Sequence, residues 1–378
     1  MSIKIGYLDF LFITPKTLKA FRTPKYFFSK EKRAKVLSTL PTLYFLLSLF
    51  VKIHLRFQIF LVSSSPLKIM VTGVKGGFIK DSQVPNKQIQ NKIEYLGFRI
   101  ALAGLKLLPA KAAKSVLKGL FWFGGWVIGI RKYVALKQLS KVYPDKSKKE
   151  KAEIVKKLYR NMALTVYESY LMDDDTLYKN IRIQGREYID NALSLNRGVI
   201  FAAAHYGNWE AARILPKAGI PISGIAKPQR NTLFDNYTNA IRERCGMRII
   251  NMKRGLRDII HEFKENRIVA ILIDQNAGSS GLVMDFLGFP ASHWKGVAKL
   301  SLRYKIPIVP SFARRAEDDR IQFEFFPPIL HEELEDTEEN YKIVLEEVDK
   351  ILENQIHKHP EQWFWVHLRW KHSYNMLA

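Results

Sequence analysis

A histidine and a glutamate that could form an acid–base pair stand five positions apart near the middle of the chain. The apolar run Gly198 to Ala204 (GVIFAAA) predicts a buried strand, and His205 follows it directly. A helix is expected to begin at Trp209, with Glu210 in its first turn, so the Glu210 carboxylate is expected to reach the imidazole. Histidine takes a proton readily near neutral pH, and a carboxylate on its other ring nitrogen fixes the tautomer. His205 and Glu210 are therefore predicted to be a catalytic dyad that activates a hydroxyl.

Taken singly, both residues have ordinary explanations. His205 could be a core or capping histidine, and Glu210 a solvated acid favoured by the helix dipole. Together, after a buried strand, they favour catalysis, because ligands bind at the carboxyl ends of the strands of an open α/β sheet. Attack on a thioester would also need an oxyanion site, which backbone N–H groups at the helix start are expected to supply.

Short β-branched runs alternate with helical patterns in the second half of the chain. The expected strands are Gly198 to Ala204, Ile222 to Ala226, Arg248 to Ile250, Ile268 to Ile273 and Ile308 to Phe312. This alternation predicts an α/β domain with a mostly parallel central sheet flanked by helices. Further helices are expected at Gln88 to Leu107, Lys146 to Tyr170 and Tyr341 to Lys358. For the aromatic and basic run Trp363 to Lys371, a strand packed on the sheet and an interfacial anchor are both expected.

The first part of the chain is basic and partly apolar. Residues 1–69 contain only Asp9 and Glu31 as acids, and their apolar run Val36 to Val51 is interrupted by Pro41. Such a run predicts a borderline membrane span or an interfacial segment. Alternatively, these residues precede a natural start at Met70. We therefore divide the chain into 1–87, a basic extension or start-site artefact, 88–145, membrane-associated helices, and 146–378, the catalytic domain.

The segment Val116 to Ile130 (VLKGLFWFGGWVIGI) has two open interpretations. Its length suits a buried core helix. Its tryptophans and basic flanks favour a membrane-embedded hairpin, in which Gly125 and Gly129 would let helices approach closely in lipid.

The composition narrows the classes of partner. Sixty Lys and Arg against 36 Asp and Glu give a formal charge of +24, which favours polyanionic partners. Apolar and aromatic residues beside the basic ones favour a membrane surface over nucleic acid. Cys245 is the only cysteine, so an intrachain disulfide and a multi-cysteine metal site are excluded. Cys245 itself is expected to be a small buried hydrophobe rather than a nucleophile.

The hexapeptide HYGNWE at 205–210 resembles the H-x4-D/E motif of the lysophospholipid acyltransferase superfamily. Its form is similar to that of the lipid A biosynthesis (lauroyl/myristoyl) acyltransferases. The resemblance covers roughly residues 181–371, because five segments follow in that family's order: RGVIFAAAHYGNWE, AKPQRNTLFDNYTNAIRERCGMRII, RIVAILIDQNAG, VMDFLGFPASHWKGVAKL and HPEQWFWVHLRWK.

The resemblance implies roles for individual residues. His205 would be the general base and Glu210 its partner. Arg242 would help to shape the active site, Asp274 would be the acidic residue after a strand, and both are expected with Asn208 at the substrate site. Without the resemblance, Arg242 would be a solvated helix residue and Asp274 a turn or cap residue.

One segment departs from the family pattern. The family often has FFG and a Thr-rich continuation where this chain has Leu287, His293 and Trp294. The departure leaves the acyl-chain and acceptor preferences open. His293 is expected to be a local substitution rather than a second catalytic base.

The resemblance implies transfer of a fatty acyl chain from acyl carrier protein or CoA to a hydroxyl of a lipid A precursor or related glycolipid. The expected location is the cytoplasmic face of the bacterial inner membrane, and no metal or other cofactor is expected. An acidic carrier would suit the basic chain through electrostatic steering.

Two alternatives stay open. One is transfer to another membrane lipid, such as a phosphatidylinositol mannoside or an aminolipid. The other is a non-catalytic basic membrane-binding protein, which would not explain HYGNWE after a buried strand. A serine hydrolase is disfavoured because the sequence has no G-x-S-x-G motif.

Overall fold

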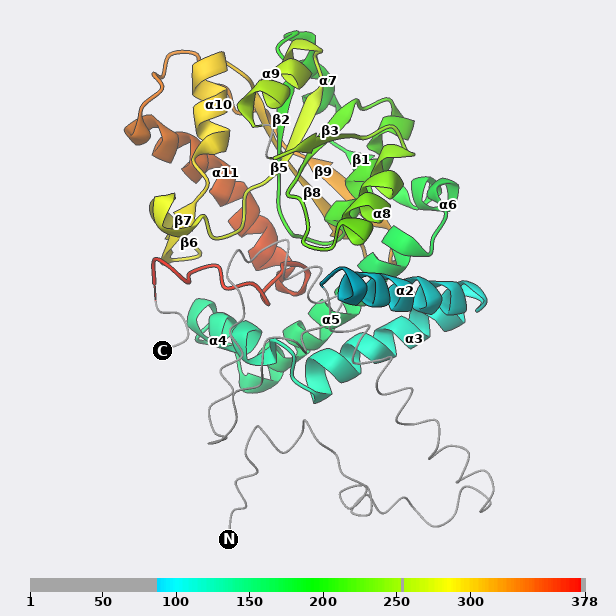
Figure 1. Cartoon of the computed structure of the whole chain (residues 1–378). Helices are drawn as coiled ribbons and strands as arrows, with labels where there is room; N and C mark the ends of the chain where they lie inside the picture. Colours follow the sequence, from blue (N-terminus) through cyan, green and yellow to red (C-terminus); the bar gives the residue numbers. More distant parts are fainter. Residues whose placement is uncertain (1–86, 253–254, 375–378) are drawn as a thin grey trace, which may run out of the picture. The chain divides into compact units, whose positions relative to one another are not determined.

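The computed structural model describes residues 87–252 and 255–374 (Figure 1). The predicted basic extension, its apolar run at 36–51 and the alternative start at Met70 lie outside the described residues. The predictions for the N-terminal extension therefore stay predictions.

A seven-stranded sheet forms the centre of the described structure, in the strand order β1-β9-β8-β2-β5-β3-β4. All neighbouring strands are parallel except β8 and β9. The strands are β1 Ile181–Gln184, β2 Val199–Ala203, β3 Ile222–Ala226, β4 Arg248–Asn251, β5 Ile268–Leu272, β8 Ile308–Arg315 and β9 Ile321–Phe325. The five predicted strands and the mostly parallel α/β sheet are thus confirmed.

Side-chain alternation along β2 divides the core into two layers. Val199, Phe201 and Ala203 pack into one cluster with α7 (Arg186–Ser194), the 3₁₀ helix η4 (Trp209–Ala218) and α8 (Thr232–Glu243). Ile200 and Ala202 point into the other cluster, with α9 (Leu256–Lys264), α10 (Gly296–Tyr304) and α11 (Glu338–Lys358). Successive side chains of a strand alternate between faces, so a strand buried on both faces reads as a continuous apolar run. The sheet is therefore covered by helices on both sides (Figure 1).

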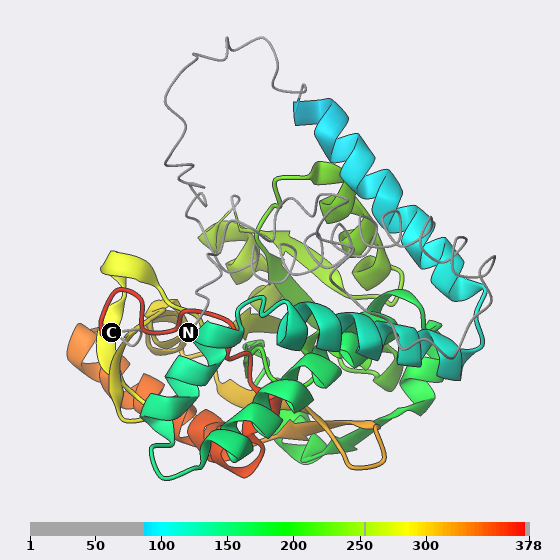
Figure 2. The same cartoon turned by 90° about the horizontal axis from the view of Figure 1, so that it is seen from below.

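The helices before the sheet share its first core cluster. They are α2 Lys87–Lys106, α3 Ala110–Trp122, the π-helix η3 Phe123–Val127, α4 Lys132–Val142, α5 Lys148–Tyr170 and α6 Asp174–Lys179. The long α5 begins at a capping box, in which Ser147 and Glu150 exchange hydrogen bonds of 3.2 and 2.8 Å. Figure 2 shows α2 to α5 from below, where α3 and α5 pack against each other.

Gly125, in η3, lets this segment pack closely against α5 of the same protein, rather than against a helix in lipid. A Cβ on Gly125 would lie 2.3 Å from the ring of Tyr159 in α5. Leu117 and Phe121 of α3 are fully buried on the same side, whereas Trp122 and Val127 are half exposed. One face of this segment is therefore part of the protein core, as the core-helix interpretation predicts, and membrane association of the helices at 88–145 stays a prediction.

The outer face of α2 carries a stripe of exposed apolar side chains. Ile93, Leu96 and Ile100 are each 59% exposed, and Leu107 just after the helix is 88% exposed. Among residues 87–252 and 255–374, no helix combines the length and the hydropathy needed to cross a bilayer.

The C-terminal run differs from both predictions. Residues 360–374 form the 3₁₀ helix η6 (Pro360–Gln362) followed by turns. They make one isolated β-bridge, between Trp363 and Tyr206, which lies just after β2. Trp363, Trp365 and Trp370 are at most 1% exposed. Neither a strand nor an interfacial anchor is formed by these tryptophans, because their rings pack against one another and against Phe286 inside the core.

Candidate active site

A tight turn at the carboxyl end of β2 positions His205. The turn needs glycine at position 207, where φ is +57° and a Cβ would lie 1.9 Å from the carbonyl oxygen of Ala313. The C-terminal segment fixes the same turn, since the N–H of Gly207 donates to Gln362 and the carbonyl of His205 accepts from the N–H of Phe364. The backbone of the turn is therefore held by two distant parts of the chain, since the N–H of Asn208 also donates to Ala313.

Asp274 is the carboxylate that orients the imidazole. It follows β5, the strand next to β2, and its Oδ1 lies 2.8 Å from Nδ1 of His205. Its Oδ2 accepts hydrogen bonds from the His205 backbone N–H at 3.0 Å and from the Trp363 indole at 2.9 Å. A carboxylate can only accept, so Nδ1 carries the proton and Nε2 is left as the basic nitrogen.

The protonation state of Asp274 follows from these contacts. Burial acts to raise the pKa of its carboxyl, but the charge and hydrogen bonds of His205 and the bond from Trp363 hold that pKa below its ordinary value. Asp274 is therefore ionised at neutral pH and can stabilise a positive charge on His205.

Glu210 does not make the predicted contact with the imidazole. Its carboxylate forms a bidentate pair with Arg242 of α8, with bonds of 2.7 and 3.1 Å. Burial acts to raise the pKa of Glu210, but Arg242 outweighs it and lowers that pKa overall. The expectation of a direct His205–Glu210 hydrogen bond is corrected here: the helix start points Glu210 at α8, and Nδ1 of His205 is occupied by Asp274.

The predicted residues Arg242 and Asp274 are thus both near His205, in different ways. Arg242 lines the same pocket as His205 and Glu210, while Asp274 lies behind the imidazole and is not part of the pocket wall. Arg242 is not the solvated residue that its helix alone would suggest, since only 13% of its side chain is exposed.

Asn208 is placed differently from its prediction as a substrate contact. It is 1% exposed, does not line the pocket, and donates at 2.7 Å to Glu168 of α5. The Glu168 carboxylate also receives two bonds from Arg315, of 2.6 and 2.7 Å. Asn208 is therefore a positioning residue that ties the His205 turn to a buried ion pair.

Glu168→Gln is expected to lower the free energy of unfolding by about 3 kcal/mol, because it leaves the buried Arg315 charge without its partner. Urea denaturation of wild type and variant measures the difference. Glu153→Gln is the matched control, since the Glu153–Lys156 pair is exposed and should contribute less than about 1 kcal/mol. Equal effects of the two substitutions would contradict the structural role of the buried pair.

Gln275 lies over the imidazole. Its amide nitrogen is 2.9 Å from Nε2 and 3.1 Å from Nδ1 of His205. An atom nearly equidistant from both ring nitrogens lies over the ring and not on the in-plane lone pair of Nε2. Gln275 was not among the predicted site residues, and the one signal that could have found it is its place directly after Asp274.

Cys245 and His293 both lie outside the pocket wall. Cys245 is buried, and burial raises the pKa of its thiol, which does not suit a nucleophile. His293 is 2% exposed, does not line the pocket, and has its Nε2 at 2.8 Å from Asp349.

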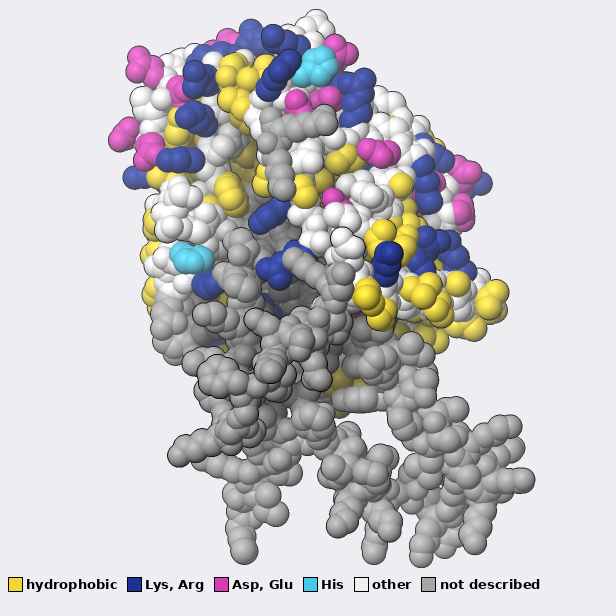
Figure 3. All heavy atoms as spheres, in the orientation of Figure 1, with side chains coloured by type: hydrophobic (Ala, Val, Ile, Leu, Met, Phe, Trp, Pro, Cys, Tyr) yellow, Lys and Arg dark blue, Asp and Glu magenta, His cyan; other side chains and the backbone are white. Residues whose placement is uncertain are grey.

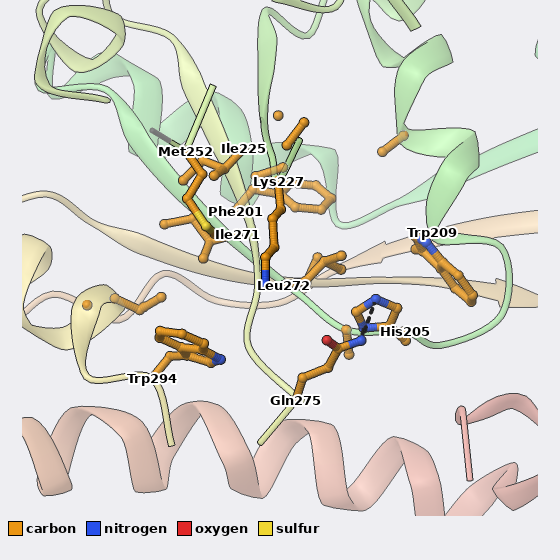
Figure 4. A pocket seen from close by; sticks show the side chains of 18 of the residues that line it. Phe201, His205, Trp209, Ile225, Lys227, Met252, Ile271, Leu272, Gln275 and Trp294 are labelled. Atoms are coloured by element: carbon orange, nitrogen blue, oxygen red, sulfur yellow. Dashed lines mark hydrogen bonds between the residues drawn. The ribbon is translucent and has the colours of Figure 1, made fainter. Parts of the chain in front are cut away.

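A pocket of about 560 Å³ opens beside His205. Figure 4 shows His205 and Gln275 at one end, and Ile225, Met252 and Ile271 at the other. The walls at that far end are aliphatic and come from the carboxyl ends of β3, β4 and β5 and from α9. Such a pocket suits an apolar chain whose reacting end lies at the imidazole.

Basic side chains line the same pocket, among them Arg131, Lys227 and Lys371. Glu210 is the one carboxylate in the wall as far as the described residues go, and Arg242 neutralises it. Figure 3 shows Lys and Arg side chains within the hollow of this face. Across residues 87–252 and 255–374, no group of three His, Cys, Asp or Glu side chains is arranged to hold a metal ion.

Known proteins with similar sequences are acyltransferases. The chain is 23% identical over 230 residues to a lipid A biosynthesis acyltransferase of Haemophilus influenzae, covering 59% of this chain and 70% of that protein. It is 23% identical over 275 residues to the lipid A biosynthesis myristoyltransferase of Escherichia coli, covering 70% and 83%. A phosphatidylinositol mannoside acyltransferase of Mycobacterium tuberculosis is 24% identical over 135 residues, or 34% of this chain and 42% of that protein.

Among solved structures, the 1-acyl-sn-glycerophosphate acyltransferase PlsC of Thermotoga maritima aligns with a TM-score of 0.34 at 13% identity, covering 68% of this chain and 100% of that one. The family sequence model of the bacterial lipid A biosynthesis acyltransferases matches residues 85–372, which contain the His205 turn, the pocket and the C-terminal segment. The chain belongs to the bacterial lipid A biosynthesis acyltransferase family.

Proposed function

We propose that the protein transfers a fatty acyl chain from acyl carrier protein or CoA to a hydroxyl of a lipid A precursor, with His205 as general base. The observation that carries the proposal is the Asp274-oriented imidazole at the end of an aliphatic pocket. Nε2 of His205 takes the proton of the acceptor hydroxyl while that oxygen attacks the thioester carbonyl. The tetrahedral intermediate then expels the thiolate, which takes the proton back from the imidazolium.

The oxyanion of that intermediate needs donors near His205. The N–H groups of Gly207 and Asn208 already bond to Gln362 and Ala313. The next two N–H groups, of Trp209 and Glu210, begin η4 without a side-chain cap, and both residues line the pocket. The ammonium of Lys227 also lies in the pocket, between its aliphatic end and His205 (Figure 4). These groups are the oxyanion donors we assign.

Glu210 acts through Arg242 in this proposal. The ion pair joins the start of η4 to α8 at the pocket wall, so it fixes the helix start that carries the oxyanion donors. The direct dyad is thus replaced by two carboxylates with separate roles. Asp274 orients the imidazole, and Glu210, through Arg242, positions the oxyanion donors at the start of η4.

We place the enzyme at the cytoplasmic face of the bacterial inner membrane. Supporting observations are the exposed apolar stripe of α2 and the lysines and arginines that accompany it on α2 and α3. An amphipathic basic helix can lie in the headgroup region with its apolar side chains in lipid.

The direct test incubates the full chain in membranes with radiolabelled acyl-carrier protein or acyl-CoA and each of three acceptors. These are a lipid A precursor, a phosphatidylinositol mannoside and a lysophospholipid. Transfer to the lipid A precursor supports the proposal. Transfer only to the mannoside would show that the acceptor is another membrane lipid and not a lipid A precursor. No transfer to any of the three acceptors would overturn the proposed donor and acceptor.

The aliphatic end of the pocket is expected to set the acyl length. Ile271→Trp enlarges a half-buried side chain of the wall and should shift preference to shorter donors. Each methylene that no longer fits removes about 0.8 kcal/mol, so a donor longer by two carbons should lose about tenfold in relative kcat/KM. Competition between donors of different length measures this ratio. Ile343→Trp, on the exposed face of α11, should leave the ratio unchanged.

A further inference from the structure

Arg131 is the residue through which the segment between α3 and α4 reaches the active-site pocket. It precedes α4 and lines the same pocket as His205. Its backbone is in the left-handed region, at φ 61° and ψ 5°, which is unfavourable for a residue with a Cβ. Strain of this kind is kept where the surrounding structure imposes it, and it gathers at functional sites.

Hydrogen bonds on both sides impose this conformation. The N–H of Ile130 donates to Gly124 at 3.1 Å, and its carbonyl accepts from the Tyr159 hydroxyl at 2.6 Å. The carbonyl of Arg131 accepts from the N–H of Ala135 at 3.1 Å. The arginine is therefore fixed at its backbone by α5 and by the first turn of α4.

The guanidinium is not neutralised by the protein. No carboxylate or carbonyl of the described chain pairs with it, and burial lowers its pKa without an opposing charge. Glu210 in the pocket wall is already paired with Arg242, and Asp274 behind the imidazole is paired with His205. A partly buried cation without a partner is less stable than a paired one, so an anionic group of a ligand would stabilise this site.

We propose that Arg131 binds a phosphate group of a substrate. This inference rests on the proposed function and specifies how that same site recognises its ligand. A guanidinium matches a phosphate with two parallel hydrogen bonds, and the lysines of the pocket add charge. The phosphate has two possible sources with the same chemistry: the phosphopantetheine arm that CoA and acyl carrier protein share, or a phosphate of the glycolipid acceptor.

Kinetics with substrates that have or lack the phosphate distinguish the sources. Arg131→Gln should raise KM about 10- to 100-fold for the phosphate-bearing substrate and change kcat less than threefold. If the donor supplies the phosphate, KM for an S-acyl-pantetheine without phosphate should be the same in wild type and variant. If the acceptor supplies it, the same equality should hold for the dephosphorylated acceptor. Arg131→Lys should recover part of the effect, and Arg303→Gln, an exposed arginine outside the pocket, should have none.

A binding experiment separates this inference from the proposed reaction. The His205→Ala protein is heated with and without 4′-phosphopantetheine, and in parallel with inorganic phosphate. A rise in melting temperature that disappears in His205→Ala/Arg131→Gln supports the phosphate site even if acyl transfer fails. The inference is overturned if Arg131→Gln changes neither the melting shift with any phosphate ligand nor KM for any phosphate-bearing substrate.

Discussion

His205→Ala is expected to lower acyl transfer at least 10³-fold while the protein remains folded. Nε2 of His205 is the basic nitrogen left by the Asp274 contact, and it lies at the end of an aliphatic pocket suited to the acyl chain. General-base catalysis contributes about 10²- to 10⁴-fold, and here the same nitrogen also returns the proton to the leaving thiolate. The measurement is the initial rate of labelled acyl transfer in membranes with equal amounts of each protein.

The fold should survive this substitution because the contacts that build the turn come from the backbone. The N–H of residue 205 still donates to Asp274, and its carbonyl still accepts from Phe364. His331→Ala, a partly exposed histidine bonded to Glu333 and Glu347, is the matched control and should keep full activity. A His205→Ala protein that retained more than a tenth of the wild-type rate would rule out His205 as the base.

The sequence predicted the centre of the sheet well because buried parallel strands are continuous apolar runs. GVIFAAA in β2 and Ile268–Leu272 in β5 have this pattern, and each has a parallel neighbouring strand on both sides. The edge strand β1 (IRIQ) and strand β9 (IQFEF) are short and alternate apolar with polar residues, so they stood out less. The hairpin of β6 (Leu282–Phe286) and β7 (Phe289–His293) turns at Leu287 and Gly288, both with positive φ, and a leucine there is not a turn signal.

The sequence predicted which residues lie around the active site, but not which of them form hydrogen bonds with one another. Spacing along the chain favoured Glu210 as the partner of His205, since five residues across a turn is a short distance. The true partner, Asp274, lies 69 positions away and arrives because β5 is the neighbour of β2 in the sheet. Strand order is a non-local property, so a sequence pattern that finds two strand ends does not tell which of them are adjacent.

The same limit explains the C-terminal run. A row of tryptophans beside arginine and lysine has the composition of an interfacial belt. In the structure Trp363 instead donates to Asp274, and Gln138 of α4 bonds to the carbonyl of Trp365. Those contacts link the last residues of the domain to its first helices, and no local pattern contains them.

Asp274→Asn is expected to lower acyl transfer about 10³- to 10⁴-fold, and more than Glu210→Gln does. An asparagine at 274 can present its N–H₂ to Nδ1 of His205, and the proton then moves to Nε2, where it blocks acceptance of the hydroxyl proton. Loss of the carboxylate also removes the charge that stabilises the imidazolium. Shape and hydrogen bonding are otherwise nearly unchanged, so the effect should appear in kcat with little change in KM.

Glu210→Gln separates the two carboxylates. Because the Glu210 carboxylate bonds to Arg242 and not to the imidazole, its loss should loosen the start of η4 and lower the rate about 10- to 100-fold. Parallel rate measurements on the two variants, with equal expression and melting temperature, give the comparison. If Glu210→Gln is the more damaging of the two, the imidazole is served by Glu210 during turnover and the Asp274 contact is structural. If Asp274→Asn is the more damaging, the catalytic pair is His205 and Asp274, which follow the adjacent strands β2 and β5.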